Sequence, residues 1–244
     1  MSSDNPYIAG NPVGKTPVFV GREDIQKKVL QILRHPNQNA ITLYGQRRIG
    51  KTSVLQYMEA HLAEKGAYIP LLFDLQDKTE MPLHLLLGDL AREIAAKVEM
   101  QPPTITDDFE QVFYQQWLPR ALRALPEEHS LVLLFDEFDV LADPQSERIN
   151  RNFFTYFRNL MQHNPQKLQF VFVMGRNISD LSNIALSIFK GVPSERVSLL
   201  TRKDTEFLIR ISEREGSLGW SDEAVAAVWN LTRGHPFLTQ ALCS

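Results

Sequence analysis

The fold of this chain is predicted by one short stretch, Gly45-Gln46-Arg47-Arg48-Ile49-Gly50-Lys51-Thr52. It matches the pattern G-x-x-x-x-G-K-[ST], whose glycines let the backbone curl so that successive N–H groups point at phosphate oxygens. Lys51 would place an ammonium group on the β- and γ-phosphates of a nucleotide, and the Thr52 hydroxyl can ligate Mg²⁺. The stretch follows an apolar run and opens a helical pattern, whose positive end would face the anion. These residues predict a phosphate-binding loop between a strand and a helix.

Short apolar runs, each a predicted strand, alternate with helical patterns along the rest of the chain. The predicted strands cover 40–44, 67–74, 131–135, 168–174 and 196–200. The predicted helices cover 22–34, 51–64, 82–99, 107–125 and 145–163. This alternation predicts an α/β fold, a P-loop NTPase with a five-stranded parallel sheet and helices on both faces. Pro70 suits a strand near the sheet edge, and we expect the aromatic residues of 107–125 and 145–163 to pack in the core.

An acidic pair ends the predicted strand in LVLLFDE at 131–137. Asp136 is expected to hold Mg²⁺ through water. Glu137, one residue further, would point to the other side and polarise a water for attack on the γ-phosphate. Taken alone, the segment could also be a strand that ends in solvated acids. Together with the phosphate-binding loop, it indicates the division of P-loop ATPases that has an extra central strand and a catalytic glutamate.

Three further segments are candidates for contact with a nucleotide. Gly175-Arg176 ends the predicted strand at 168–174, where a cationic side chain can sense the γ-phosphate; an exposed loop arginine is the alternative. Val20-Gly21-Arg22-Glu23 precedes the first helix, and Gly234-His235-Pro236 lies near the end of the chain. Each of the last two is an ordinary turn when taken alone.

In this order, these segments resemble the STAND class of signalling ATPases, which includes plant disease-resistance proteins, apoptosome proteins and many bacterial regulators. The loop GQRRIGKTS also resembles archaeal-type ATPases and their AAA+ relatives that load replication machinery. The resemblance covers about residues 5–244. It implies that Val20 and Gly21 line an adenine pocket, that Arg176 contacts the γ-phosphate and that Pro236 packs near the base or ribose.

The expected site follows from the motifs and the resemblance together. The residues expected to bind ATP or ADP are Val20, Gly21, Gly45, Gln46, Arg47, Arg48, Ile49, Gly50, Lys51, Thr52, Ser53 and Pro236. The residues expected to act in hydrolysis are Lys51, Glu137 and Arg176, and those expected to hold Mg²⁺ are Thr52 and Asp136.

The chain divides into three predicted parts. Residues 1–18, rich in Pro, Gly and Asn, are predicted to form an extended N-terminal arm, and 19–200 the ATPase core. Residues 201–244 are predicted to form a small helical lid, with Thr201 and Ser221 as helix caps. An apolar helix stops after about two turns at Ser244, so we expect an excised piece of a longer protein, with a lid truncated at its C-terminal end.

The amino-acid composition limits the kinds of partner and the cellular compartment that we expect for this chain. The formal net charge is −3. Because a domain that binds nucleic acid usually has an excess of basic residues, nucleic acid is not an expected partner. A single cysteine, Cys243, rules out an intrachain disulfide and fits a reducing compartment. No secretory signal and no apolar run of about 20 residues is present. We therefore expect a cytoplasmic protein away from membranes, which meets protein partners or self-assembles through regions missing from this chain.

The function expected from the resemblance is a regulatory switch that binds ATP and hydrolyses it slowly. The alternative is an AAA+ style loader or machine acting on nucleic acid, which would need an arginine donated in trans; Arg196 is the nearest candidate. A non-hydrolysing nucleotide-bound scaffold is a third reading, which the intact Lys51, Thr52, Asp136 and Glu137 argue against.

Overall fold

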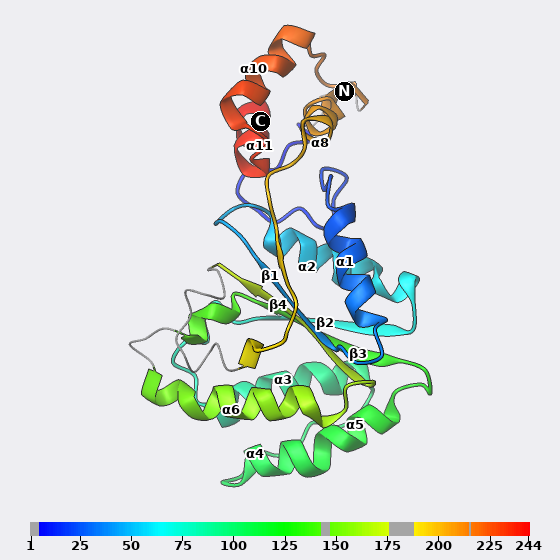
Figure 1. Ribbon diagram of the computed structural model, residues 1–244, viewed down its shortest axis with the longest axis vertical. Helices are drawn as coiled ribbons and strands as arrows, with labels where there is room; N and C mark the ends of the chain where they lie inside the picture. The colour runs from blue at the N-terminus through cyan, green and yellow to red at the C-terminus, as the bar shows by residue number, and fades with distance from the viewer. Residues whose placement is uncertain (1–4, 143–146, 176–187, 215) are drawn as a thin grey trace.

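The computed structural model describes residues 5–142, 147–175, 188–214 and 216–244. A layered α/β core forms one part, and helices from the C-terminal end form a lid over one end of it (Figure 1). Both chain ends lie at the lid. None of the helices in these ranges is long and apolar enough to cross a membrane.

The core contains one five-stranded parallel sheet. Its strands are β1 (Ala40–Tyr44), β2 (Tyr68–Asp74), β3 (Ser130–Asp136), β4 (Leu168–Met174) and β5 (Ser194–Arg196). Their order is β2-β3-β4-β1-β5, and every pairing is parallel. The predicted fold class is thus confirmed: β4 is the extra central strand between β1 and β3. Strand β2, which contains Pro70, lies at an edge, where a missing N–H costs no ladder bond.

Helices cover both faces of the sheet (Figure 1). Those of the core are α1 (Glu23–Leu33), α2 (Lys51–His61), α3 (Leu83–Lys97), α4 (Phe109–Val112), α5 (Leu118–Ala124) and α6 (Glu147–His163). Short turns of other helical types are η1 (Leu62–Lys65), η2 (Phe113–Trp117) and η3 (Phe138–Ala142). The predicted helix at 107–125 is therefore α4, η2 and α5 in succession.

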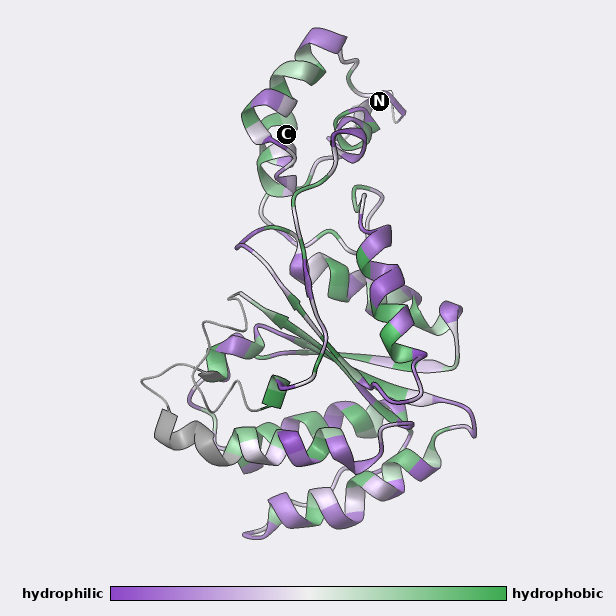
Figure 2. Cartoon of the chain, viewed as in Figure 1, coloured by the Kyte–Doolittle hydropathy of each residue, from purple (hydrophilic) through white to green (hydrophobic). Residues whose placement is uncertain are grey.

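Alternate strand residues divide the core into two layers. Ile41 and Leu43 of β1 pack with α1 and α2, whereas Phe170 and Phe172 of β4 pack with α3, α5 and α6. Apolar colour accordingly follows the strands and the inward faces of the helices (Figure 2). The aromatic residues of the two predicted helices are buried in the second layer, as expected: Phe109, Phe113, Trp117, Phe153, Phe154 and Phe157.

The fifth strand was predicted at 196–200, but β5 is Ser194–Arg196, so only one residue is shared. Beyond it, the N–H of Val197 still donates to the carbonyl of Tyr44 (2.8 Å). The N–H of Leu200 instead donates to Gly234 of the lid (2.8 Å). The apolar pattern at 196–200 is therefore a crossing to the lid, in which Val197 and Leu200 are buried, rather than a strand.

The lid consists of α8 (Arg202–Ile209), α9 (Ile211–Arg214), α10 (Asp222–Thr232) and α11 (Pro236–Cys243). Both predicted caps are confirmed, since the side chains of Thr201 and Ser221 accept bonds from backbone N–H groups of the first turns of α8 and α10. The N-terminal segment joins the lid, because Tyr7 packs in a cluster with Ile209 of α8.

Candidate functional site

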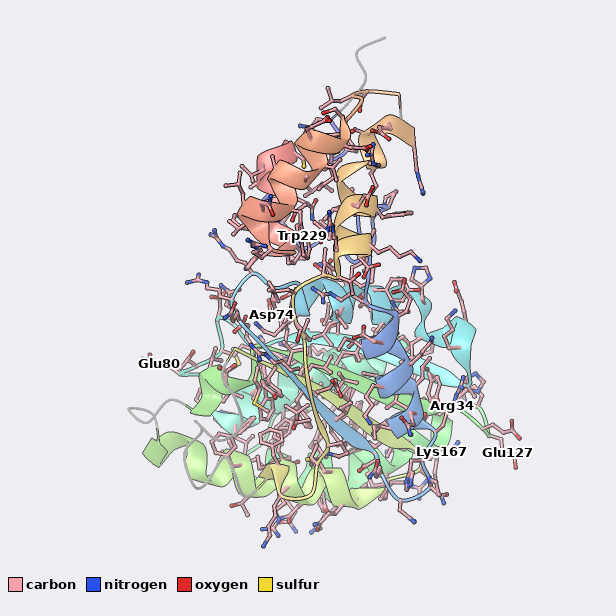
Figure 3. All side chains as sticks on the ribbon, turned by 45° about the horizontal axis from the view of Figure 1, so that its top comes forward. Arg34, Asp74, Glu80, Glu127, Lys167 and Trp229 are labelled. Carbon is pink, nitrogen blue, oxygen red and sulfur yellow. The ribbon has the colours of Figure 1, made fainter. Side chains whose placement is uncertain are left out.

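A cavity of about 680 Å³ lies between the core, the N-terminal segment and the lid. It sits at the carboxyl ends of the strands: in Figure 3, Asp74, the last residue of β2, lies at the end of the sheet beneath the lid residue Trp229. Arg34 and Lys167 lie at the opposite end. Open parallel sheets bind ligands at their carboxyl ends, and this volume is that of a small-molecule or cofactor site.

Segments far apart in the sequence form the walls of this cavity. They are residue 8, residues 10–13, 18–20, 22, 47–53, 76, 137, 139, 175, 200, 208, 236 and 237. The core supplies the phosphate-binding loop and the acids after β3. The N-terminal segment and the lid supply a more apolar part of the wall.

The predicted phosphate-binding loop joins β1 to α2, and its backbone has the expected curl. Gly50 caps α2 with φ +94°, and Arg48 also adopts a left-handed conformation, with φ +61°. The Lys51 ammonium donates to the carbonyls of Gly45 (3.1 Å) and Gln46 (3.0 Å). Residues 47–52 line the cavity, whereas Gly45 and Gln46 contribute these carbonyls behind it.

Lys51 is a buried cation surrounded by acids. Burial lowers the pKa of its ammonium group, while the nearby carboxylates of Glu137, Asp136 and Asp139 favour the charged form. A cation held between loop carbonyls and carboxylates can neutralise part of the charge of a polyphosphate.

Thr52 and Asp136, the two residues expected to hold Mg²⁺, come together. Asp136 is only 3% exposed, and the Thr52 hydroxyl is near enough to influence its pKa. Burial raises the pKa of the Asp136 carboxyl, whereas the neighbouring Thr52 hydroxyl and the bond from the N–H of Glu137 (3.0 Å) lower it. A hydroxyl and a buried carboxylate are the hard oxygen donors that Mg²⁺ takes, so this pair fits the ion.

Glu137 lies at the cavity wall with an unusual backbone. Its φ is +51°, in the left-handed region that non-glycine residues rarely adopt and that is common at functional sites. Burial raises the pKa of its carboxyl, and Asp136 and Asp139 raise it further. Its carboxyl therefore lies at the same cavity as the phosphate-binding loop, with its affinity for a proton increased.

Arg176, the predicted γ-phosphate sensor, lies outside the described residues. Its neighbour Gly175 directly follows the buried strand β4 and lines the cavity. Its N–H donates to the Asp139 carboxylate (2.9 Å).

The two predicted adenine-end segments meet across the cavity, since Val20 and Pro236 both line it. Gly21 instead supports the lid: its φ is +66°, and a Cβ there would lie 2.6 Å from Cγ of Asp204. Gly234 has a similar role, since its φ is +84° and a Cβ would lie 2.3 Å from the carbonyl oxygen of Leu200. Only glycine fits at these two contacts between core and lid.

Ser53, another predicted nucleotide-binding residue, lines the cavity and also holds the N-terminal segment. Its hydroxyl oxygen accepts a bond from the N–H of Val13 (3.0 Å). The segment therefore runs directly over the start of α2.

Sequence reasoning missed several residues of this site. Arg22, 5% exposed, donates to the carbonyls of Ile49 (2.8 Å) and Ser198 (2.7 Å) and so braces the loop; burial lowers its pKa. Asp139 and Phe237 also line the cavity. Arg22 lies in the segment Val20-Gly21-Arg22-Glu23, and Asp139 lies two residues after Glu137, but neither sequence pattern indicates a bond to a distant backbone group.

The sheet order, the loop between β1 and α2 and the acids after β3 define a P-loop nucleoside triphosphatase. The family model described as AAA ATPase domain matches residues 18–173. The chain therefore belongs to the AAA ATPase domain family, and it is a nucleotide-binding ATPase domain of the AAA+ type. None of the curated proteins matches it.

Solved structures share the fold at low identity. The Walker-type ATPase PABY2304 of Pyrococcus abyssi is similar with a TM-score of 0.68 and 17% identity, over 100% of this chain and 70% of that chain. Domain III of the replication initiation protein DnaA of Thermotoga maritima has a TM-score of 0.56 and 18% identity, over 95% and 87%. AMPPCP-bound DnaA from Aquifex aeolicus has a TM-score of 0.55 and 18% identity, over 91% and 60%, so the chain spans less than two thirds of that structure.

Proposed function

We propose that this AAA ATPase domain is a nucleotide-controlled switch that hydrolyses ATP slowly, as in STAND-class signalling proteins. The observation that carries the proposal is the composition of the cavity wall, which combines the phosphate-binding loop, the N-terminal segment and the lid. A nucleotide in such a cavity touches all three, so ATP and ADP can stabilise different lid positions.

Each residue of the site has a separate role in the proposed function. Lys51 and the amides of residues 45–52 bind the phosphates, while Val20 and Pro236 contact the adenine or ribose. Thr52 and Asp136 would hold Mg²⁺, whose charge would offset part of the charge of the phosphates. Glu137 accepts a proton from the attacking water. Arg176 is proposed as the sensor of the γ-phosphate.

Slow turnover is part of the proposal, because the lid and the N-terminal segment both contribute to the wall of the cavity and would close over a bound nucleotide. Product release from a covered site requires movement of the cover, which often limits turnover. The signal and the output would come through protein partners or self-assembly outside this chain, in the cytoplasm.

The nucleotide that co-purifies tests the switch. Trapped ADP that exchanges slowly supports it, whereas a site that exchanges rapidly and purifies empty favours a machine. In parallel, Glu137→Gln should bind ATP normally but turn over at least ~100-fold more slowly. Equal turnover would remove Glu137 from the proposed mechanism.

A second candidate function is an AAA+ style loader or machine acting on nucleic acid. The observation that favours it is Arg196, which is exposed at the end of the edge strand β5 and could serve a neighbouring subunit. The net charge of −3 weighs against it. Three results together would favour the machine over the switch. DNA affinity would fall steeply as the salt concentration rises. Hydrolysis would depend on protein concentration and would be lost in Arg196→Ala.

A further inference from the structure

Asp139 is a buried acid of the cavity to which the proposed function assigns no role. It lies two residues after Glu137, in the turn η3, and is only 7% exposed. Its Oδ1 accepts a hydrogen bond from the N–H of Gly175 at 2.9 Å. The bond links the turn after β3 to the tip of β4.

This link lies beyond the regular pairing of the two strands. The ladder between β3 and β4 extends as far as Phe135 and Phe172. Asp139 and Gly175 therefore connect the chains three to four residues further on, where both leave the sheet. Here the two strands no longer pair, and the acceptor of the Gly175 N–H is the Asp139 side chain rather than a backbone carbonyl.

Both carboxylates converge on Gly175. A Cβ at this residue would lie 3.3 Å from Oδ2 of Asp139 and 3.9 Å from Oε2 of Glu137. The first distance is tight and the second is an ordinary contact, so the absence of a side chain at Gly175 matters chiefly for the approach of Asp139.

The backbone of Glu137 is held from several sides. Its N–H donates to Asp136 (3.0 Å), and its carbonyl accepts from the N–H of Val140 (3.0 Å). A left-handed non-glycine residue persists only where its surroundings over-determine it. The bond from Gly175 to Asp139 supplies a further restraint, because it fixes the turn that contains Val140.

We propose that Asp139 is a positioning residue for ATP hydrolysis. Its carboxylate ties the turn after β3 to Gly175 and thereby holds Glu137 at the wall of the phosphate site. This inference rests on the proposed role of Glu137. The hydrogen bond carries the effect, so an acceptor that is not charged should substitute for the carboxylate.

Two variants of the full chain separate the hydrogen bond from the charge. Asp139→Ala should lower kcat about 10- to 100-fold, the cost of a misplaced catalytic group, with KM and the Kd of mant-ADP within about 3-fold. Asp139→Asn retains Oδ1 as an acceptor and should keep kcat within about 3-fold of the parent. Asp107→Ala, at an exposed acid, is the control for loss of a surface charge.

Gly175→Ala gives an independent reading if Asp139→Ala fails to fold. Its added Cβ crowds Oδ2 of Asp139 without removing the carboxylate, so the same selective loss of kcat is expected. Loss of kcat in Asp139→Asn as large as in Asp139→Ala would overturn the proposal, as would unchanged kcat in Asp139→Ala. Loss of mant-ADP affinity in parallel with kcat would also overturn it.

Failure of the proposed function would look different. If Glu137→Gln turns over like the parent protein, the base assignment fails whatever the Asp139 variants do. If Glu137→Gln is slow and both Asp139 variants are fast, only the positioning role is lost.

Discussion

The guanidinium carbon of Arg48 lies 4.4 Å from the centroid of the Phe237 ring. Arg48 belongs to the phosphate-binding loop, and Phe237 is the second residue of the lid helix α11. Both line the cavity. The lid therefore touches the loop directly through a cation–π contact, at a place where bound phosphates would compete for the same arginine.

Phe237→Ala should speed the release of nucleotide. Loss of the ring removes a contact worth about 0.5–1 kcal/mol at a partly exposed site, so the lid should open more often. We expect the dissociation rate of mant-ADP in stopped-flow fluorescence to rise about 2- to 5-fold, the rate equivalent of that energy. Phe207→Ala is the matched control, because Arg214 lies over that ring at 4.0 Å and both residues belong to the lid. Equal rates in the two variants would contradict the coupling.

Lys51→Ala should largely abolish nucleotide binding. The ammonium is buried beside the loop carbonyls, and its bonds to charged phosphates are among the strong ones, so the Kd of mant-ATP should rise at least ~30-fold. Lys15→Ala is the control, since Lys15 is exposed and pairs with Glu59 (2.7 Å) outside the cavity. Tight binding by Lys51→Ala, measured by fluorescence titration, would count against the phosphate-binding loop.

Tyr7→Phe should destabilise the lid. The Tyr7 hydroxyl donates to the carbonyl of Ile209, lies 2.9 Å from the Ser212 hydroxyl and accepts from the indole N–H of Trp220 (3.2 Å). Removal of a buried partner costs about 1–3 kcal/mol, which urea denaturation followed by tryptophan fluorescence can measure.

Tyr114→Phe is the comparison for that variant. The Tyr114 hydroxyl makes an exposed, long bond of 3.4 Å to the carbonyl of Asn159, so its removal should cost less than ~0.5 kcal/mol. A similar loss of stability in both variants would mean that the N-terminal segment does not hold the lid through Tyr7.

The single cysteine should report on opening of the lid. Cys243 is buried with Tyr7 and Ile209, and burial raises the pKa of its thiol to about 11. Little thiolate forms at about pH 8, so DTNB should react at least ~10-fold more slowly with the native protein than with the denatured protein. Tyr7→Phe should accelerate the native reaction. Rapid labelling of the unmodified native protein would contradict the packed lid.

The parts of the fold that were predicted correctly are those with a local signal. Apolar runs identified β1, β2, β3 and β4 because a parallel strand is buried on both faces. The fifth strand was misplaced because Val197 is buried in the core layer of β1 and Leu200 against the lid, on a segment that is leaving the sheet. An apolar pattern in the sequence indicates that residues are buried, but it does not indicate which element buries them.

The residues of the candidate site likewise fall into those with a local sequence signal and those without one. The motif at 45–52 and the acids at 136–137 were assigned from sequence, because their chemistry requires particular residues at a fixed spacing. The roles of Arg22 and Asp139 depend on backbone groups far along the chain, at Ile49 and Ser198 for Arg22 and at Gly175 for Asp139. No spacing rule relates such pairs.

By itself, the sequence determined that this chain forms a parallel sheet with a phosphate-binding loop at the start of a helix. Backbone curl, helix direction and side-chain chemistry are encoded within a few neighbouring residues there. Tertiary structure alone decided that residues 8–13 and the lid cover that loop and that Arg48 stacks on Phe237. These contacts join segments up to about 200 residues apart, and their geometry follows from the packing of the whole core.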